Sequence, residues 1–221
     1  MDLYGLIGRS LSHSFSSSFF NEKFTEENIQ ASYSNFELET LENIQDVFQI
    51  TGLNGLNVTI PYKEQIIPFL DEIDPLAAKI NSVNTIKVLR ENEGLKFKGF
   101  NTDVYGFYQL IRSYLKPYHE KALILGTGGA SKAVAHVLLE YGVNVNYISR
   151  KKTNGNIYNW SEMNDYFIKN HLLIINTTPV GMFPNQDMKL SIYYDAISSK
   201  HLIIDLIYNP SETFFLKECK Q

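Results

Sequence analysis

Residues 123–141, LILGTGGASKAVAHVLLEY, join an apolar strand to an amphipathic helix through a glycine turn. The apolar run ends at Gly126, Gly128 and Gly129 follow, and apolar residues then recur at helical spacing. Because glycine has no side chain, backbone N–H groups at such a turn can approach a pyrophosphate at the helix N-terminus. We therefore expect a dinucleotide site formed by Gly126, Thr127, Gly128, Gly129 and Ala130. Glycine turns also occur for structural reasons alone, and Ser131 stands where this fingerprint usually has glycine or alanine.

The end of the next strand indicates which dinucleotide binds. About 20 residues past the glycines, an NAD-binding chain usually presents Asp or Glu to the ribose hydroxyls. This chain presents Ser149, Arg150 and Lys151 there. Cationic groups attract a 2′-phosphate, and a guanidinium can bind it bidentately. The sequence thus favours NADP over NAD, with a solvated basic turn as the alternative interpretation.

Both halves of the chain alternate predicted strands with helices, which is typical of an α/β fold. An amphipathic helix begins at Asp103, and we place the domain boundary there. Residues 1–102 are expected to form a substrate-binding catalytic domain with a mainly parallel sheet. Residues 103–221 are expected to form a Rossmann-like, doubly wound domain that binds the cofactor. The predicted strands are 3–8, 32–38, 53–60, 84–90 and 95–101 in the first domain, and 121–126, 143–149, 171–178 and 201–208 in the second.

The composition limits the classes of partner. The chain has 221 residues, 44% of them hydrophobic, and a net charge of −4 without a block of like charges. This composition does not suggest a nucleic-acid surface or a polybasic membrane patch, so we expect a small-molecule partner. The single cysteine, Cys219, excludes an internal disulfide and fits a reducing compartment. Since the chain shows neither a signal-peptide pattern nor an apolar stretch of membrane-spanning length, we expect a cytoplasmic protein.

Polar residues gather where the predicted strands of the first half end. In NVTIPYKE, residues 57–64, Pro61 stops a strand and Lys63 follows within two residues. Open α/β sheets bind ligands outside the carboxyl ends of their strands. Hydroxyls, amides, one lysine and one carboxylate suit a small polyhydroxylated ligand with a carbonyl or alcohol under attack. The candidate residues are Ser14 and Ser16 after the first strand, Asn57, Thr59 and Lys63 around the third, and Asn84 and Asp103 at the edges of two later segments.

Each of these residues also has a purely structural interpretation. Pro61 could open a helix that leaves Lys63 in solvent. Ser14, Ser16 and Asp103 could cap helices, and Asn84 could satisfy loop backbone groups. No cluster has metal-ligand spacing, so we expect no metal site.

Taken together, eight blocks resemble the shikimate dehydrogenase family from residue 3 to about residue 216. The blocks are GLIGRSLSHSFS, NVTIPYKE, NSVNTI, NTDVYGF, GTGGASKAV, ISRK, NTTPVGM and DLIYNPSETFFL. The resemblance implies NADPH-dependent reduction of 3-dehydroshikimate to shikimate, with Lys63 and Asp103 as the catalytic pair. It also implies that Ser14, Ser16, Thr59, Asn84 and Tyr208 contact the substrate and that Leu206 lies near the nicotinamide.

The resemblance leaves some points open. The family's chains continue past the position of Gln221 into helices that return to the first domain, so either this protein is truncated or such a tail follows these 221 residues. The ISRK block departs from the family's usual Asn-Arg-Thr but keeps Arg150. A non-catalytic NADP(H)-binding module, a quinate/shikimate dehydrogenase paralogue and, more distantly, a folate-linked dehydrogenase are the alternative functions. We expect a monomer or a homodimer.

Overall fold

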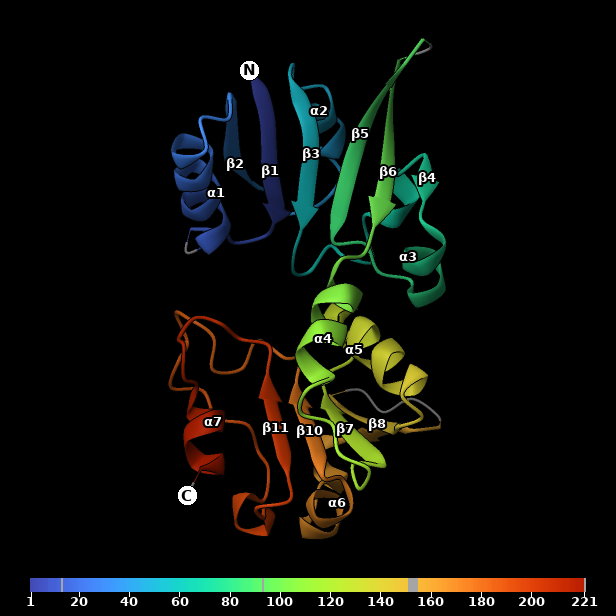
Figure 1. Cartoon of the computed structure of the whole chain (residues 1–221), viewed down its shortest axis with the longest axis vertical. Helices are drawn as coiled ribbons and strands as arrows, with labels where there is room; N and C mark the ends of the chain where they lie inside the picture. Colours follow the sequence, from blue (N-terminus) through green and yellow to red (C-terminus); the bar gives the residue numbers. More distant parts are fainter. Residues whose placement is uncertain (13, 93, 151–154, 221) are drawn as a thin grey trace. The chain divides into compact units, whose positions relative to one another are not determined.

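The computed structural model describes residues 1–12, 14–92, 94–150 and 155–220. The chain divides into two compact units, Met1–Asp103 and Val104–Gln221. Figure 1 shows a sheet with flanking helices in each of them. The α/β class expected from the sequence is therefore confirmed.

The first unit contains a six-stranded sheet in the order β2-β1-β3-β5-β6-β4. Strand β1 runs parallel to both β2 and β3, and β4 runs parallel to β6. The antiparallel pairs are β3 with β5 and β5 with β6, and the second of these is a hairpin. The strands are β1 (Asp2–Gly8), β2 (Ala31–Glu37), β3 (Leu53–Val58), β4 (Glu72–Ile73), β5 (Thr85–Glu91) and β6 (Gly94–Phe100).

Helices cover both faces of this sheet. Successive residues of a strand point to opposite faces, so Leu6 and Ile7 on β1 belong to different apolar clusters. Leu6 packs with Phe20 and Phe24 of α1 (Phe15–Glu26), whereas Ile7 belongs to the larger core built around α2 (Ile44–Phe48) and α3 (Pro75–Ile80). Strand β1 is thereby fixed by apolar packing on both faces of the sheet.

The second unit contains a five-stranded sheet in the order β11-β10-β7-β8-β9, with every neighbouring pair parallel. Because the order reverses at β7, the carboxyl ends of β7 and β10 flank the topological switch point of a doubly wound sheet. The strands are β7 (Lys121–Leu125), β8 (Asn144–Ser149), β9 (Ile157–Asn159), β10 (Leu173–Asn176) and β11 (Leu202–Asp205).

The helices of this unit bury apolar stripes of the expected kind. Helix α4 (Asp103–Ile111) buries Val104, Phe107 and Ile111 and leaves the neighbouring Tyr108 44% exposed. Helix α5 (Gly129–Glu140) packs on β7 and β8, and α7 (Phe214–Cys219) packs on β11 (Figure 1). Helix α6 (Asp165–Asn170) precedes β10.

Several elements differ from the expected ones at their ends. The strands expected over 171–178 and 201–208 end at Asn176 and Asp205, where side chains capture the next amides and turn the chain. Pro61 opens no helix, since residues 61–66 form turns that lead into the short 3₁₀ segment Ile67–Phe69. The elements β4, α3, β9, α6 and α7 were not expected from the sequence, and all of them are six residues or shorter.

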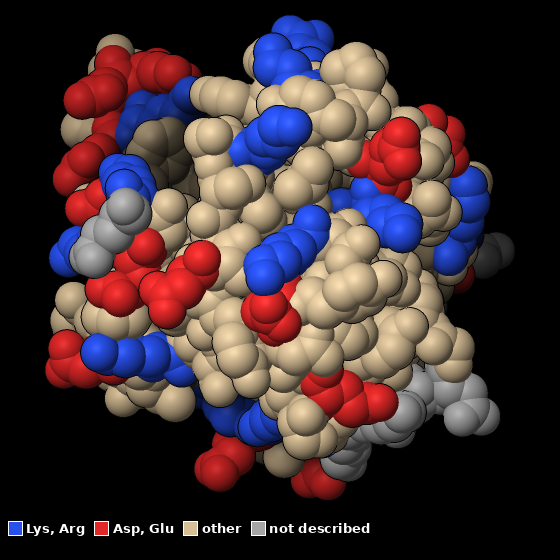
Figure 2. All heavy atoms as spheres, turned by 90° about the horizontal axis from the view of Figure 1, so that it is seen from below, with Lys and Arg blue, Asp and Glu red and all other residues tan. Residues whose placement is uncertain are grey.

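Charge is mixed on the face shown in Figure 2, where Lys and Arg side chains are interspersed with Asp and Glu. Among the described residues, no helix is both long and apolar enough to cross a membrane. The described residues also contain no group of three His, Cys, Asp or Glu side chains that could hold a metal ion.

Candidate functional site

Lys63 and Asp103 form an ion pair within the first unit. Nζ of Lys63 lies 2.7 Å from Oδ2 of Asp103. The Lys63 side chain is 16% exposed and that of Asp103 is 32% exposed, so both are shielded but reachable from solvent. At this distance the ammonium and the carboxylate form a charge-assisted hydrogen bond, which fixes how the two groups lie. The structure thus brings together two residues that stand 40 positions apart in the sequence.

Asn84 holds the other oxygen of the carboxylate. Its Nδ2 donates to Oδ1 of Asp103 at 2.8 Å and to Oγ1 of Thr102 at 2.9 Å. Its Oδ1 accepts from the backbone N–H of Thr102 at 2.8 Å and from the hydroxyl of Thr85 at 3.0 Å. Asn84 is only 8% exposed, so its amide is oriented by a set of bonds that leaves it little freedom to rotate. The sequence indicated Asn84 and Asp103 as candidates but not Thr102, although Thr102 lies next to Asp103 in the NTDVYGF block.

The turn after β3 is what places Lys63. Tyr62 is completely buried, and its hydroxyl donates to the backbone carbonyl of Leu38. The carbonyl of Lys63 accepts from the N–H of Val83 at 2.7 Å, which ties the turn to the segment before β5. Because the ring of Tyr62 is anchored in the core and the carbonyl of Lys63 is hydrogen-bonded, the backbone of Lys63 is held in place just beyond the end of β3.

Ser14, Ser16 and Thr59 lie beyond the carboxyl ends of β1 and β3. Ser14 is the N-cap of α1 and accepts from the N–H of Ser16 at 3.3 Å, so the capping interpretation holds for Ser14. Thr59 donates its N–H to the carbonyl of Ile7 on β1 at 2.9 Å. All three side chains are half-buried. These hydroxyls therefore lie at the same edge of the sheet that carries the turn to Lys63.

The glycine turn of the second unit lies at the switch point of its sheet. Gly126 has φ +105°, and a Cβ there would lie 2.9 Å from Oγ1 of Thr177. Gly128 is the N-cap of α5, and a Cβ at this position would meet nothing within 4 Å. The turn is therefore closed on the side of Thr177 and open at the N-terminus of α5, where helix amides attract an anion.

Ser131, which stands where the fingerprint usually has glycine or alanine, fits into the first turn of α5. Its side chain is 1% exposed, and its hydroxyl donates to the carbonyl of Gly128 at 2.6 Å. The buried hydroxyl thus has a partner within the same turn of helix, so it adds no unsatisfied polar group.

The end of β8 reaches this turn. The hydroxyls of Ser149 and Thr127 lie 3.3 Å apart. Arg150 is exposed, and its carbonyl accepts from Nδ2 of Asn159 at 3.0 Å, which orients the backbone beside the turn. Lys151, expected at the cofactor, lies outside the described residues.

Two further polar residues, Asn176 and Asp205, end the neighbouring strands β10 and β11. Asp205 carries the segment with Leu206, which is half-buried, and Tyr208, which is 66% exposed. Burial raises the pKa of the Asp205 carboxyl above its usual 3.8, and hydrogen bonds from Thr213, Ile207 and Asn176 oppose that rise. Asn176 and Asp205 are the first residues of the NTTPVGM and DLIYNPSETFFL blocks, but the sequence indicated no role for either of them. The available signal was one Asn or Asp within each predicted apolar run, a few residues before the end that the sequence predicted.

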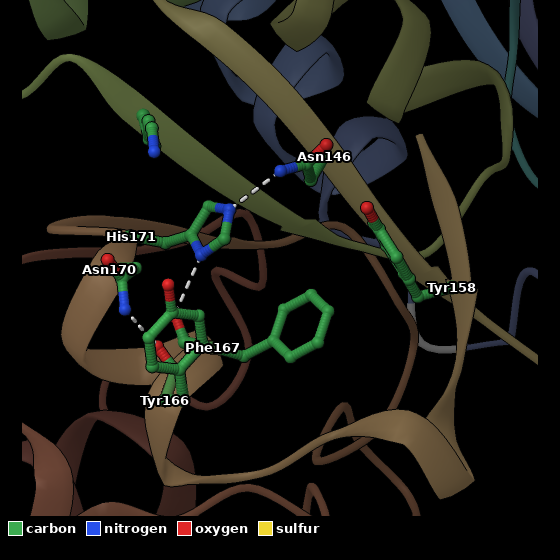
Figure 3. Close-up of a pocket in the computed structure, with 7 residues that line it drawn as sticks. Asn146, Tyr158, Tyr166, Phe167, Asn170 and His171 are labelled. Carbon is green, nitrogen blue, oxygen red and sulfur yellow. Dashed lines mark hydrogen bonds between the residues drawn. The ribbon is translucent and has the colours of Figure 1, made fainter. Parts of the chain in front are cut away.

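A hollow of about 190 Å³ lies at the opposite edge of the same sheet, near the start of β7 (Figure 3). His171 is 5% exposed there, and Nδ1 lies 2.7 Å from the carbonyl of Phe167 while Nε2 lies 2.8 Å from Nδ2 of Asn146. Because a carbonyl only accepts, Nδ1 carries the proton and Nε2 accepts from the amide. Burial lowers the pKa of His171 below 6.5, so the ring is neutral near neutral pH.

Comparison with known proteins agrees with the resemblance found in the sequence. The family model described as the shikimate dehydrogenase substrate binding domain matches residues 6–86. A relative from Clostridium beijerinckii, named shikimate dehydrogenase (NADP(+)), is 38% identical over an alignment that covers 98% of this chain and 82% of the relative.

Solved structures match over the same extent. The crystal structure of shikimate dehydrogenase 1 from Peptoclostridium difficile matches with a TM-score of 0.84 and 37% identity, over 100% of this chain and 82% of that one. A shikimate dehydrogenase solved in complex with NADP⁺ matches with a TM-score of 0.77 and 32% identity, over 100% of this chain and 81% of that one.

Proposed function

This chain belongs to the shikimate dehydrogenase family, and we propose that it catalyses the reversible NADPH-dependent reduction of 3-dehydroshikimate to shikimate in aromatic amino-acid biosynthesis. The observation that carries this proposal is the Lys63–Asp103 ion pair, whose carboxylate is also bonded by Asn84. The NADP-dependence of the named relatives and the NADP⁺ complex of one similar structure support the choice of cofactor.

Lys63 is the proton donor in this proposal. NADPH, when bound, supplies a hydride to the carbonyl carbon of the substrate. Negative charge then develops on the carbonyl oxygen, and the ammonium of Lys63 donates a proton to it as the C–O bond becomes single. In the reverse direction, Lys63 in its neutral form would accept the hydroxyl proton, while the hydride would pass from the carbon to NADP⁺. General acid–base assistance of this kind is worth about 10²–10⁴-fold in rate.

Asp103 orients Lys63 and binds a ring hydroxyl of the substrate in this proposal. Oδ2 accepts from Lys63 and Oδ1 from Asn84, and a carboxylate has lone pairs to spare for a further donor. Ser14, Ser16, Thr59, Asn84 and Tyr208 supply the other substrate contacts. Four of these five lie in the first unit, which supports its role as the substrate-binding domain.

The residues of the second unit fit the cofactor. The pyrophosphate would lie against Gly126, Thr127, Gly128, Gly129 and Ala130, since a side chain at Gly128 would occupy the open space at the N-terminus of α5. Arg150, supported by Ser149 and Lys151, would bind the 2′-phosphate, and Leu206 would contact the nicotinamide. These roles make Val104–Gln221 the cofactor domain.

The test is shikimate-dependent reduction of NADP⁺, followed by absorbance on the purified chain and on Lys63→Ala. We expect turnover by the wild-type chain and a loss of about 10²–10⁴-fold in kcat in the variant. Lys96→Ala is the matched control, because Lys96 pairs with Glu91 on an exposed hairpin. Tight NADP⁺ binding without turnover would contradict the proposed reaction and favour a non-catalytic NADP(H)-binding module. Faster turnover of quinate than of shikimate would indicate the paralogue.

We also propose a cytoplasmic location, which the single cysteine supports because an internal disulfide is impossible. A monomer or a homodimer is expected, and sedimentation equilibrium of the purified chain measures which of the two forms.

A further inference from the structure

The neighbouring strands β10 and β11 end in the same way. Oδ1 of Asn176 accepts from the N–H of Thr178 at 3.0 Å, and Oδ1 of Asp205 accepts from the N–H of Ile207 at 3.0 Å. Each side chain thus captures the amide two residues ahead and turns the chain, as Asn and Asp commonly do. Asn176 and Asp205 are also direct partners in the register of the parallel pair.

A side-chain hydrogen bond joins these two turns. Nδ2 of Asn176 donates to Oδ1 of Asp205 at 3.0 Å. The backbone continues the link, since the N–H of Leu206 donates to the carbonyl of Asn176 at 3.1 Å. The two segments that leave the sheet at its switch point are therefore connected by one polar bridge.

The same carboxylate also holds the chain where it returns to the sheet. Oδ2 of Asp205 accepts from the hydroxyl of Thr213 at 2.6 Å, and Thr213 is the N-cap of α7. Residues 206–212 are thus fixed at both ends by Asp205. Between these ends, the carbonyl of Asn209 accepts from the N–H of Phe183 at 3.1 Å, which attaches the loop to the segment after β10.

The partners of Asp205 need an acceptor at this position. Asn176 is 0% exposed and Thr213 is 1% exposed, so water does not replace a lost bond to either of them. Asp205 itself is half-buried. Its two oxygens receive three donors, which a carboxylate satisfies without offering a competing N–H. An asparagine would retain one acceptor oxygen and would turn an NH₂ group towards one of the donors.

The other end of the bridge leads to the glycine turn. The hydroxyl of Thr177, which follows Asn176, donates to the carbonyl of Leu125 at 2.7 Å. Leu125 and Asn176 are register partners, and Gly126 packs closely against Thr177. The polar chain from Asp205 therefore extends across the carboxyl ends of three adjacent strands.

We propose that Asp205 is a positioning residue for hydride transfer, which holds residues 206–208 in place relative to the glycine turn. This inference rests on the proposed function, in which Leu206 contacts the nicotinamide and Tyr208 contacts the substrate. Asp205 acts through these residues and need not touch either ligand. Because the phosphate contacts lie on β7, α5 and β8, its loss affects the alignment of the nicotinamide more than the binding of NADP⁺.

The test compares Asp205→Ala and Asp205→Asn with the wild-type chain. We expect kcat for shikimate oxidation to fall about 10–100-fold in Asp205→Ala, in line with a small misplacement of reacting atoms, while the Kd for NADP⁺ changes less than about threefold. With shikimate deuterated at the oxidised carbon, the isotope effect on kcat should rise. Asp205→Asn keeps one acceptor and should recover part of kcat.

Asn146→Ala is the matched control. It removes the partner of the buried His171 at the opposite edge of the same sheet, so it perturbs stability without reaching the switch point. We expect a lowered Tm and an unchanged kcat. If Asp205→Ala lowers kcat no more than this control does, or weakens NADP⁺ binding as much as it lowers kcat, the inference is wrong.

Hydrogen exchange separates this inference from the proposed function. A wild-type chain without turnover contradicts the proposed function. The exchange rate of the Ile207 amide in the presence of NADP⁺ then tests whether Asp205 positions residues 206–208. Faster exchange in Asp205→Ala but not in Asn146→Ala supports the positioning of residues 206–208. Equal exchange in the wild-type chain and Asp205→Ala overturns it.

Discussion

The ammonium of Lys63 lies 2.7 Å from the carboxylate of Asp103, and both residues belong to the same compact unit. The pair is therefore assembled by the fold of that unit alone. Lys63 comes from the turn after β3, and Asp103 is the first residue of α4. Since β3 and β6, the strands that lead to them, both contribute side chains to the larger apolar core, packing in that core sets the separation of the two groups.

Asp103→Asn tests what the carboxylate contributes. The amide can still occupy the same space, but it no longer attracts the ammonium of Lys63, so we expect kcat to fall at least about tenfold. Steady-state kinetics with shikimate and NADP⁺ measures this effect. Asp165→Asn removes the partner of Lys169 in an exposed ion pair and should leave kcat unchanged. Wild-type kcat in Asp103→Asn would show that the charge has no role.

Gly126→Ala should disturb the glycine turn, against which we propose that the pyrophosphate lies. A Cβ would lie 2.9 Å from Oγ1 of Thr177, and the φ of +105° is unfavourable for any residue with a side chain. We expect the Kd for NADP⁺ to rise at least about tenfold, measured by calorimetric titration, because the displaced backbone aligns poorly with the pyrophosphate.

Gly106→Ala is the control for this substitution. Gly106 lies within α4, and a Cβ there meets nothing within 4 Å. Alanine in a helix interior is favoured over glycine by roughly 0.5–1 kcal/mol, so this variant should melt slightly higher and bind NADP⁺ normally. Equal affinity of the Gly126 and Gly106 variants would contradict the role assigned to Gly126.

Arg150→Ala should change the choice of cofactor. A charge-assisted hydrogen bond contributes about 1.5–3 kcal/mol, so losing the guanidinium should weaken NADP⁺ binding by about 10–100-fold. NAD⁺ has no 2′-phosphate, and its Kd should hardly change. Titrations of both cofactors give the ratio, with Lys169→Ala as a control on α6. A parallel loss of NADP⁺ and NAD⁺ affinity would rule out a specific contact with the 2′-phosphate.

His171 should make stability depend on pH. Burial is the main cause that lowers its pKa in the folded chain, with the charge of Lys121 acting in the same direction. Between this lowered pKa and the ordinary value of 6.5, the unfolded chain binds more protons than the folded chain does. The free energy of unfolding therefore has its full value above pH 6.5 and falls as the pH drops below it. The effect is visible as a Tm that decreases on acidification.

His171→Gln should reduce this decrease in Tm, since glutamine does not titrate and can still accept from Asn146. Thermal melts at several values between pH 8 and pH 5 make the comparison. Asn170→Ala is the control, because it removes a hydrogen bond to the carbonyl of Tyr166 beside the same hollow without removing a titrating group. An unchanged pH dependence in His171→Gln would assign the effect to other residues.

Local signals were sufficient for much of the fold. The glycine turn after residues 121–125 and the apolar stripe of α5 lie within one stretch of sequence, and both were recognised from spacing alone. Short elements escaped detection, because two residues in β4 or three in β9 are too few to show a period. The end of β11 was placed too late, since its apolar pattern continues past Asp205.

The sequence by itself determined the α/β class, the longer strands of both halves and the polar residues near their ends, because these depend on the order of neighbouring residues. Only the tertiary structure decided that Asn84 bonds Asp103 and that Asp205 accepts from both Asn176 and Thr213. These bonds join residues 8 to 29 positions apart. Which of many polar side chains meet depends on strand order and register, and packing of the whole sheet sets both.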